Sequence, residues 1–322
     1  MKATAIAHTN IALIKYWGKR DENLILPANS SLSITLDKFY TETSVEWMED
    51  AKNDLFSLNG QIKQDAKVAQ FLKILRAELD IPYFAKIDSV NHVPTAAGLA
   101  SSASAFAALA VAGSAALGRQ DDLANLSRLA RRGSGSAARS LFGGLSIWEK
   151  GSRLDGLDSY AVPFNSPLTE KMAVVVAVVS DAEKAVSSRD GMKSTVLTSP
   201  FFHDWIQTAE EDLRNIKSAF LSGKFVEVGE ILEHNAMKMH ATTLGAKPPF
   251  TYFSPASLTV MDEVRKLRDE GIPAYFTMDA GPNVKIICLR ENEKMVASRM
   301  EKLVKDVYIC HAGEGAKVIQ VD

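Results

Sequence analysis

A loop of small residues leads into an alanine-rich segment between Pro94 and Ala103, with the sequence PTAAGLASSA. Gly98 and the alanines allow a ligand to approach the backbone closely, and the first N–H groups of a following helix would point at that ligand. Serine hydroxyls in the same segment can bind phosphate oxygens or Mg²⁺. The loop has neither the lysine of a Walker loop nor the glycine spacing of a dinucleotide fingerprint. It predicts a phosphate site or, as the alternative, an Ala/Ser helix packed closely against a neighbour.

A second stretch of small residues, RRGSGS, runs from Arg131 to Ser136 and is followed by Arg139. Guanidinium groups beside hydroxyls and free backbone N–H groups suit a phosphate or diphosphate, because one arginine can donate two parallel hydrogen bonds to two phosphate oxygens. Arg139 lies within the Gly/Ser stretch and is the better ligand candidate. Arg131 and Arg132 are expected instead at the solvated end of a helix.

Two charged residues, Lys15 and Asp279, occur where their neighbours predict a strand and a turn. Lys15 lies in an otherwise apolar segment, NIALIKYWGK, where a buried ammonium is costly unless it has an anionic partner. A salt bridge at a sheet edge is the alternative interpretation. Asp279 opens the sequence DAGP, which is ordinary turn chemistry. If this turn faces the phosphate loop, the carboxylate could act as a base on a substrate hydroxyl.

The polar segment from Ala185 to Gly191 lies at the presumed junction of two domains. Its side chains could close over a substrate or cap the helix that follows. The two cysteines, Cys288 and Cys310, have no metal-ligand spacing and fit a reducing compartment.

Strands and hairpins are predicted for the first third of the chain from runs of β-branched and aromatic residues. The predicted elements are strands at Thr4 to His8, Ile11 to Tyr16, Ser31 to Asp37, Tyr40 to Trp47 and Tyr83 to Asp88, with a helix at Lys67 to Leu79. The stretch from Val93 to Gly118 is uncharged and longer than a membrane span, but alanine and serine dominate it and supply little transfer free energy. A tightly packed internal helix explains this stretch better.

The second half alternates strands and helices in an order typical of a ferredoxin-like domain. A strand at Met172 to Val179 precedes helices that begin near Ser199, Phe225 and Ser254. The remaining predicted elements are strands at 274–278 and 284–289, a helix at 293–304 and a strand at 307–310.

The 322 residues carry 37 Lys and Arg against 39 Asp and Glu, a formal net charge of −2. The apolar fraction of 46% and the charged fraction of 24% are ordinary for globular proteins, which excludes a disordered chain and a disulfide-stapled miniprotein. Without a basic excess, non-specific binding to nucleic acid or to anionic membranes is not expected. A local cluster of positive charge remains compatible with this balance.

The same motifs, in the same order, occur in the GHMP small-molecule kinase superfamily, and the chain resembles its diphosphomevalonate decarboxylase family in particular. The resemblance rests on segments 10–19, 27–31, 94–103, 133–139, 187–189 and 279–283. The strings KYWGK and DAGPN are specific to this branch, and Ala100 stands where the kinases have the middle glycine of GLGSS. The resemblance implies an α+β, two-domain GHMP kinase fold. An N-terminal β/α domain for ATP and phosphate (residues 1–182) would face a C-terminal ferredoxin-like domain (residues 183–322) across the active-site cleft.

This family implies ATP-dependent decarboxylation of mevalonate 5-diphosphate to isopentenyl diphosphate, with release of ADP, phosphate and CO₂ and with Mg²⁺ as cofactor. By match to the motifs, Asp279 would orient or deprotonate the substrate hydroxyl, and Lys15 would support that geometry. The implied substrate-binding residues are Tyr16, Lys19, Ser134, Ser136, Arg139, Ser188 and Arg189. The implied ATP- and phosphate-binding residues are Gly98, Leu99, Ala100, Ser101, Ser102, Ser104 and Lys184, of which Ser101 and Ser102 would also hold Mg²⁺.

Two other functions remain open from the sequence. One is a kinase that stops after phosphorylation, such as a mevalonate or phosphomevalonate kinase, and the other is an inactive relative that only binds nucleotide. The presence of Asp279, Lys15 and Ser102 together argues against the inactive relative. The family also implies a cytoplasmic homodimer that acts on small molecules and binds neither nucleic acid nor membranes.

Overall fold

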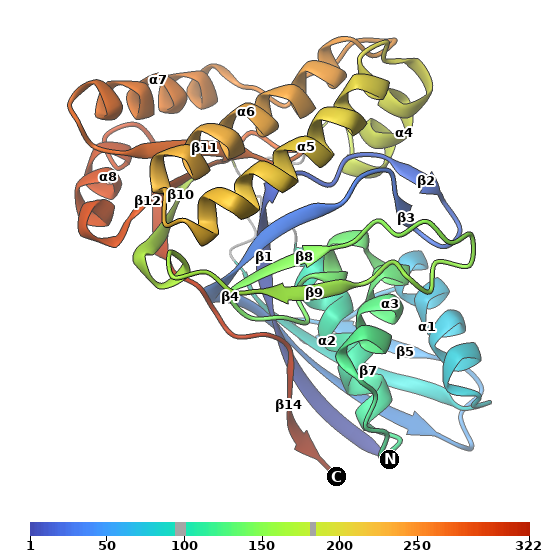
Figure 1. Cartoon of the computed structure of the whole chain (residues 1–322). Coiled ribbons are helices and arrows are strands. Elements are labelled where there is room, and N and C mark those ends of the chain that lie inside the picture. Colours follow the sequence, from blue (N-terminus) through green and yellow to red (C-terminus); the bar gives the residue numbers. More distant parts are fainter. Residues whose placement is uncertain (94–100, 181–184) are drawn as a thin grey trace.

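Two long strands, β1 (Lys2–Ile14) and β4 (Ser31–Met48), form the spine of the larger sheet (Figure 1). The computed structural model describes residues 1–93, 101–180 and 185–322. Within these ranges the sheet has eight strands in the order β14-β1-β4-β7-β5-β6, with β8 joined to β4 and β9 joined to β8. Its other strands are β5 (Leu55–Leu58), β6 (Gln61–Ile62), β7 (Phe84–His92), β8 (Leu145–Trp148), β9 (Ala161–Phe164) and β14 (Lys317–Val321).

The sequence predicts two strands in the region of β1 and two in the region of β4, but each of these pairs is one continuous strand. The polar break after His8 is a shift in the β1–β4 register between His8 and Asn10. A β-bulge places an extra residue in a strand without ending it, so a short polar break does not imply a turn. The boundaries predicted near residues 9–10 and 38–39 were therefore wrong, although the strands themselves are confirmed.

Three helices, α1 (Ala66–Leu79), α2 (Ser101–Ala115) and α3 (Leu123–Gly133), pack together beside this sheet. The small side chains of α2 allow close packing: Trp47 of β4 donates from Nε1 to the Gly113 carbonyl at 2.8 Å, and a Cβ on Gly113 would lie 2.7 Å from Leu75. The fully buried alanines of α2 are Ala103, Ala107, Ala108, Ala110 and Ala112. The predicted internal helix is confirmed, and no helix among the described residues is long and apolar enough to cross a membrane.

The smaller sheet follows the predicted order of strand, helices, two strands, helix and strand. Its strands lie in the order β11 (Ala274–Met278), β12 (Val284–Leu289), β10 (Met172–Val178) and β13 (Asp306–Cys310), all antiparallel. The helices are α4 (Ser188–Thr198), α5 (Phe202–Leu221), α6 (Phe225–Leu244), α7 (Pro255–Asp269) and α8 (Glu293–Met300). One face of the sheet packs on α7 and α8, and the other packs on α5, α6 and the first sheet.

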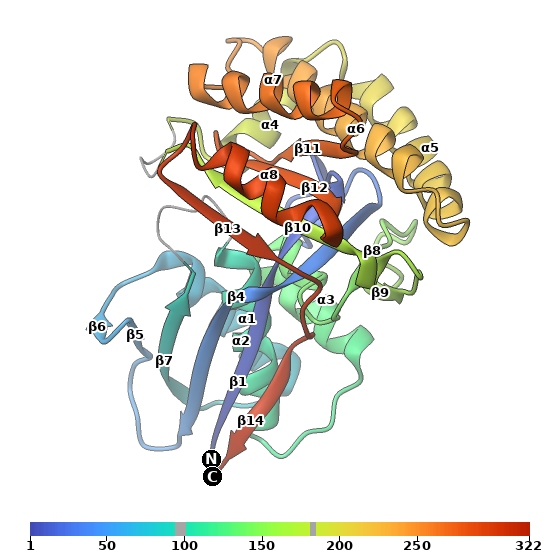
Figure 2. The ribbon, with the colours of Figure 1, turned by 90° about the vertical axis from the view of Figure 1, so that its left-hand side faces the viewer.

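The chain returns to the larger sheet at its C-terminal end, where β14 pairs antiparallel with β1 (Figure 2). The two ends of the chain lie together, with the Asp322 amide donating to the Lys2 carbonyl at 2.9 Å. The α+β fold with a ferredoxin-like sheet is thus confirmed. The predicted domain division at residue 182 stays a prediction. The sheets do not divide the chain at that point, because β10 precedes residue 182 and belongs to the smaller sheet, whereas β14 follows it and belongs to the larger sheet.

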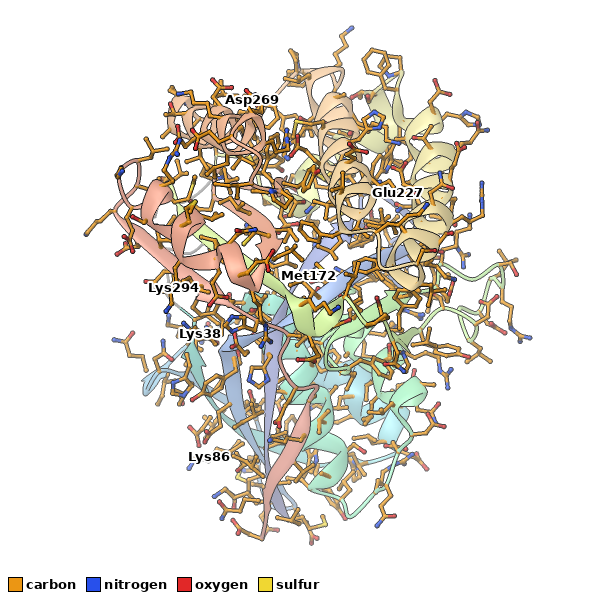
Figure 3. All side chains as sticks on the ribbon, turned by 60° about the vertical axis from the view of Figure 1, so that its left-hand side comes forward. Lys38, Lys86, Met172, Glu227, Asp269 and Lys294 are labelled. Carbon is orange, nitrogen blue, oxygen red and sulfur yellow. The ribbon has the colours of Figure 1, made fainter. Side chains whose placement is uncertain are left out.

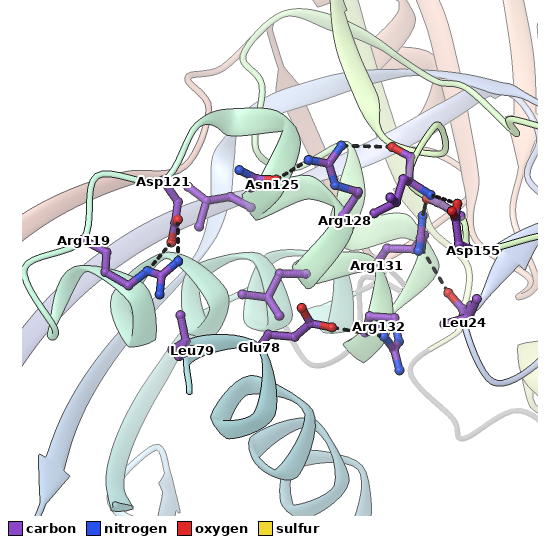
Figure 4. Close-up of a pocket in the computed structure, with 14 residues that line it drawn as sticks. Leu24, Glu78, Leu79, Arg119, Asp121, Asn125, Arg128, Arg131, Arg132 and Asp155 are labelled. Atoms are coloured by element: carbon purple, nitrogen blue, oxygen red, sulfur yellow. Dashed lines mark hydrogen bonds and ion pairs between the residues drawn. The ribbon is translucent and has the colours of Figure 1, made fainter. Parts of the chain in front are cut away.

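Arg131 on α3 differs from the sequence prediction, because its guanidinium is buried rather than solvated. It donates from Nε to the Leu24 carbonyl at 3.1 Å (Figure 4). From Nη1 it donates to the carbonyls of Gly156 (3.1 Å) and Ser159. A hollow of about 260 Å³ lies beside it. Burial lowers the pKa of Arg131 to about 10, which leaves it charged at neutral pH. Arg131 therefore fastens two loops to α3 and does not serve as a helix-end cation.

Candidate active site

An ion pair between Lys15 and Asp279 joins the two sheets. Lys15 directly follows β1, and Asp279 lies in the turn between β11 and β12. The Lys15 Nζ lies 2.7 Å from Asp279 Oδ1 and also donates to the Ala12 carbonyl at 2.8 Å. Lys15 is 2% exposed, whereas the Asp279 side chain is 32% exposed. A carboxylate that is anchored on one side and accessible on the other can accept a hydrogen bond from a bound hydroxyl.

The main chain of Lys15 is held by two asparagine side chains. Asn235 on α6 accepts from the Lys15 N–H at 2.8 Å, and Asn29 donates to the Lys15 carbonyl at 2.7 Å. Asn235 in turn donates to Asp212 on α5 at 2.7 Å, and Lys238 forms an ion pair with the same carboxylate at 2.7 Å. These contacts replace the sheet pairing that ends at Ile14, so the position of Lys15 is fixed by both parts of the molecule.

The charges around Asp279 are predominantly positive. Burial alone would raise the pKa of its carboxyl group, but the neighbouring Lys15, Lys285 and Arg139 outweigh burial and hold the pKa well below its ordinary value. Burial lowers the pKa of Lys15 to about 8, even though the Asp279 carboxylate favours the charged lysine. At neutral pH the pair is therefore ionic, and it lies in a region that favours anionic ligands.

Three serines form a row that starts at the phosphate loop. The hydroxyls of Ser102, at the start of α2, and Ser134, after α3, lie 3.3 Å apart. Ser134 and Ser136 of the 3₁₀ helix η1 (Gly135–Ala138) lie 3.2 Å apart. Asn10 donates to the Ser136 carbonyl at 3.0 Å and to Ser140 Oγ at 2.8 Å, which fixes this segment against β1. The two small-residue motifs are thus brought together, as a shared phosphate site requires.

Arg139 closes η1 and is 2% exposed. It donates from Nη1 to Ser31 Oγ at 2.7 Å and from Nε to Asn10 Oδ1 at 3.3 Å. Burial lowers its pKa to about 10, so it remains a cation beside Asp279. Neutral oxygens hold these two nitrogens, so the positive charge of Arg139 is available to an anionic ligand.

Tyr16 follows Lys15 in the loop after β1, and Ser188 and Arg189 open α4. The Tyr16 hydroxyl is buried without a hydrogen-bond partner among the described residues, and burial raises its pKa. The charge of Arg189 acts on Tyr16 and lowers the pKa of its hydroxyl, against the larger effect of burial. Ser187 caps α4 by accepting from the Asp190 N–H at 3.1 Å. Of the two interpretations of this polar segment, helix capping is confirmed.

Two predicted residues have other partners. Lys19, in β2 (Lys19–Asp21), forms an ion pair with Glu22 at 2.5 Å, so its charge is already partly neutralised. Ser104 is fully buried, hydrogen-bonded to Thr41 Oγ1 at 2.7 Å and to the Ser101 carbonyl at 3.1 Å. These contacts turn Ser104 toward β4 and attach the helix to the sheet, and its predicted contact with a nucleotide stays a prediction. Gly98, Leu99, Ala100 and Lys184 lie outside the described residues.

The side chains around the start of α2 suit a magnesium ion that is held mainly by phosphate oxygens. Mg²⁺ usually keeps one or two protein oxygen ligands and takes the others from water and nucleotide. The Ser102 and Ser134 hydroxyls supply such oxygens. Among the described residues no cluster of three or more His, Cys, Asp or Glu could hold an ion by itself. The residues present therefore fit Mg²⁺ that arrives with a nucleotide.

Comparison with known families identifies this arrangement. The model of the diphosphomevalonate decarboxylase-like N-terminal domain matches residues 7–161, and that of the mevalonate 5-diphosphate decarboxylase C-terminal domain matches residues 174–319. The chain belongs to the diphosphomevalonate decarboxylase family. The decarboxylase of Candida albicans is 39% identical over 93% of this chain and 88% of its own length. The mevalonate diphosphate decarboxylase structure from Staphylococcus aureus has a TM-score of 0.95 at 45% identity and covers 99% of this chain and 98% of its own. A structure of MDDEF in complex with MVAPP, AMPPCP and magnesium has a TM-score of 0.95 at 48% identity and covers 100% of this chain and 99% of its own.

Two residues that contact the Lys15–Asp279 pair escaped the sequence analysis. Lys285 lies under Asp279 and shows the same signal as Lys15, a lysine within an apolar strand segment. A lysine within an apolar strand segment could therefore have identified Lys285 from the sequence. Asn235 supports Lys15 from a helix more than two hundred residues away in sequence, and nothing in its local pattern indicates this contact.

Proposed function

We propose that this chain converts mevalonate 5-diphosphate and ATP into isopentenyl diphosphate, ADP, phosphate and CO₂. The observation that supports the proposal is the Lys15–Asp279 pair at 2.7 Å, because it holds one partly exposed carboxylate that can accept a hydrogen bond from a substrate hydroxyl. The solved relatives named for this reaction support the proposal, as does the magnesium- and AMPPCP-bound MDDEF structure.

In the first step Asp279 accepts a hydrogen bond from the tertiary hydroxyl of the substrate and then its proton, while the oxygen attacks the γ-phosphorus of ATP. A carboxylate with so low a pKa is a weak base, but phosphoryl transfer passes through a loose transition state in which the attacking oxygen needs little activation. Orientation of the hydroxyl is therefore the main contribution of Asp279. Lys15 holds the carboxylate in place from the opposite side.

In the second step the C–O bond of the phosphorylated hydroxyl breaks, and its electron pair leaves with the phosphate. The electron pair of the adjacent C–C bond to the carboxylate then forms the alkene as CO₂ departs. This chemistry needs no electron-sink cofactor, since the departing phosphate takes up the electrons. The residues of the chain hold the substrate rigid while this happens.

Substrate and nucleotide would occupy neighbouring anion sites. We assign the substrate diphosphate to Tyr16, Ser134, Ser136, Arg139, Ser188 and Arg189, with Lys19 as an outer contact because it is paired with Glu22. We assign the ATP phosphates to the loop that ends at Ser101 and Ser102, and to Lys184. Mg²⁺ would be held by the phosphates and by Ser101 or Ser102, and it would neutralise the phosphate charge. A cytoplasmic location is inferred from the buried free thiols Cys288 and Cys310, and a homodimer stays a family expectation.

The test is incubation of the chain with ATP, Mg²⁺ and mevalonate 5-diphosphate labelled in its carboxyl carbon. We expect ADP, phosphate and labelled CO₂ in equal amounts, and no ADP from mevalonate or phosphomevalonate offered instead. ADP formed without CO₂ would identify a kinase that stops after phosphorylation. The absence of every product, with substrate binding intact, would identify an inactive relative.

A further inference from the structure

A second buried lysine, Lys285 on β12, faces the reactive carboxylate. Its Nζ lies 3.5 Å from Asp279 Oδ2 and donates to the Asn283 carbonyl at 3.2 Å, and its side chain is 1% exposed. Lys15 contacts the other oxygen, Oδ1, at 2.7 Å. Each carboxylate oxygen therefore has its own lysine, one from each sheet.

The position of Lys285 in the smaller sheet makes this burial unusual. On β12, Val284, Ile286 and Cys288 face α7 and α8, so Lys285 faces the opposite way, into the layer between the two sheets. It pairs in register with Val176 of β10 and Thr277 of β11. An ammonium in such a layer is costly, and an apolar residue of the same length would be favoured by packing alone.

Other lysines of the chain show the usual alternative. Lys38, Lys86 and Lys294 are exposed and lie at the surface of the molecule (Figure 3). A long flexible side chain normally keeps its charged end in water while its stem packs on apolar surface. Lys285 does not do so, and among the described residues its one ion pair is with Asp279.

We propose that Lys285 is a positioning residue of the phosphoryl-transfer step, fixing the Asp279 carboxylate through Oδ2 so that its open side faces the substrate hydroxyl. The inference rests on the proposed role of Asp279. A carboxylate on a turn can rotate about its side-chain bonds, and one lysine leaves that rotation open. A second lysine on the other oxygen fixes the carboxylate plane, which matters because a small misplacement of reacting groups costs about 10²-fold in rate.

The charge of Lys285 also acts on Lys15. The groups that face this pair are Asp279 from the β11–β12 turn, Arg139 from the end of η1 and Lys285 from β12, with His240 of α6 held neutral because burial lowers its pKa to about 3. Lys285 and Arg139 both make it harder for Lys15 to keep its proton. Removing the charge of Lys285 must therefore raise the pKa of Lys15 above about 8.

The experiment compares Lys285→Met, which keeps the length and removes the charge, with the surface control Lys294→Met. We expect kcat of Lys285→Met to fall about 10- to 100-fold while the dissociation constant of mevalonate 5-diphosphate changes less than about threefold. We also expect the pKa of Lys15, followed by NMR of ¹³Cε-labelled lysine and assigned with Lys15→Arg, to rise in Lys285→Met alone. The titration reports the charge coupling, and a lysine that served only packing would leave kcat of the folded variant unchanged.

An unchanged kcat and an unchanged Lys15 titration in folded Lys285→Met would overturn the proposal. If Lys285→Met does not fold, Lys285→Gln takes its place, and failure of both to fold would show that the lysine serves stability instead. The NMR titration needs no turnover. If the wild-type protein is inactive and Lys285→Met still raises the Lys15 pKa, the proposed function is rejected and the charge coupling stands. If the wild-type protein is active and Lys285→Met changes neither kcat nor the Lys15 pKa, the proposed function stands and the role of Lys285 is rejected.

Discussion

The pH dependence of turnover should report the protonation of Lys15. Burial lowers its pKa to about 8, and the proposed role of Lys15 requires the charged form that donates to Asp279. Activity should therefore fall as the pH rises through about 8, with about half of the enzyme competent at pH 8 and about a tenth at pH 9. An ordinary lysine, with a pKa near 10.5, would give no such decrease in this range.

The size of the effect follows from the burial of one ammonium group. The difference between 10.5 and about 8 corresponds to about 3 kcal/mol in favour of the neutral form, at about 1.4 kcal/mol for each tenfold change. The 2.7 Å contact with Asp279 acts in the opposite direction, so the cost of burial exceeds what this one anion returns. Because the unfolded chain binds this proton more tightly, the contribution of Lys15 to the free energy of unfolding should increase with pH between about 8 and 10.5.

The assay is kcat/KM for mevalonate 5-diphosphate, measured by ADP release at saturating MgATP from pH 6.5 to 9.5. Lys15→Arg is the comparison, because a guanidinium stays charged throughout this range. We expect the wild-type profile to fall through about pH 8 and the variant to be less active but flat. A wild-type profile that is level to pH 9.5, or a decrease near pH 8 that persists in Lys15→Arg, would refute the reasoning.

Two further substitutions test what holds the site together. Asn235→Ala leaves the buried Lys15 N–H without its acceptor, so we expect the free energy of unfolding in urea to fall by about 1–3 kcal/mol and kcat to decrease. Wild-type values for both quantities would show that Asn235 does not position Lys15. Arg131→Met removes the contacts to three loop carbonyls, so we expect a loss of about 3 kcal/mol in the free energy of unfolding with turnover per folded molecule within about threefold of wild type. Full stability with lost turnover in Arg131→Met would instead place this arginine in the site.

Local sequence patterns predicted most elements because hydrophobic periodicity and turn residues determine where strands and helices form. They placed β11 and β12 at the residues that the structure shows, and α1 within one residue. They failed where tertiary contacts decide the outcome. The edge strand β14 has five exposed residues and no buried face to reveal it, and its pairing with β1 depends on a segment at the opposite end of the chain.

The candidate site divides in the same way. Lys15 was singled out because an ammonium is costly in its apolar context, and the serines because they lie in stretches of small residues. Asp279 lies in an ordinary turn, and its catalytic role came from the family resemblance. Sequence spacing grouped Ser104 with the phosphate loop and could not reveal that its side chain turns toward Thr41. Arg131 was placed in solvent because charged residues rarely lie buried, and the carbonyl groups that hold it come from loops that no local pattern connects with α3.

The central claim is that phosphorylation beside Asp279 precedes and permits the loss of CO₂. It is tested most directly by single turnover, with enzyme in excess over carboxyl-labelled mevalonate 5-diphosphate, in the wild type and in Asp279→Asn. The account predicts one ADP and one CO₂ per substrate in the wild type. In the variant, both products should fall together by about 10²-fold or more, with substrate still bound at the diphosphate end. Wild-type ADP formation without CO₂, or CO₂ release from Asp279→Asn at the wild-type rate, would contradict it.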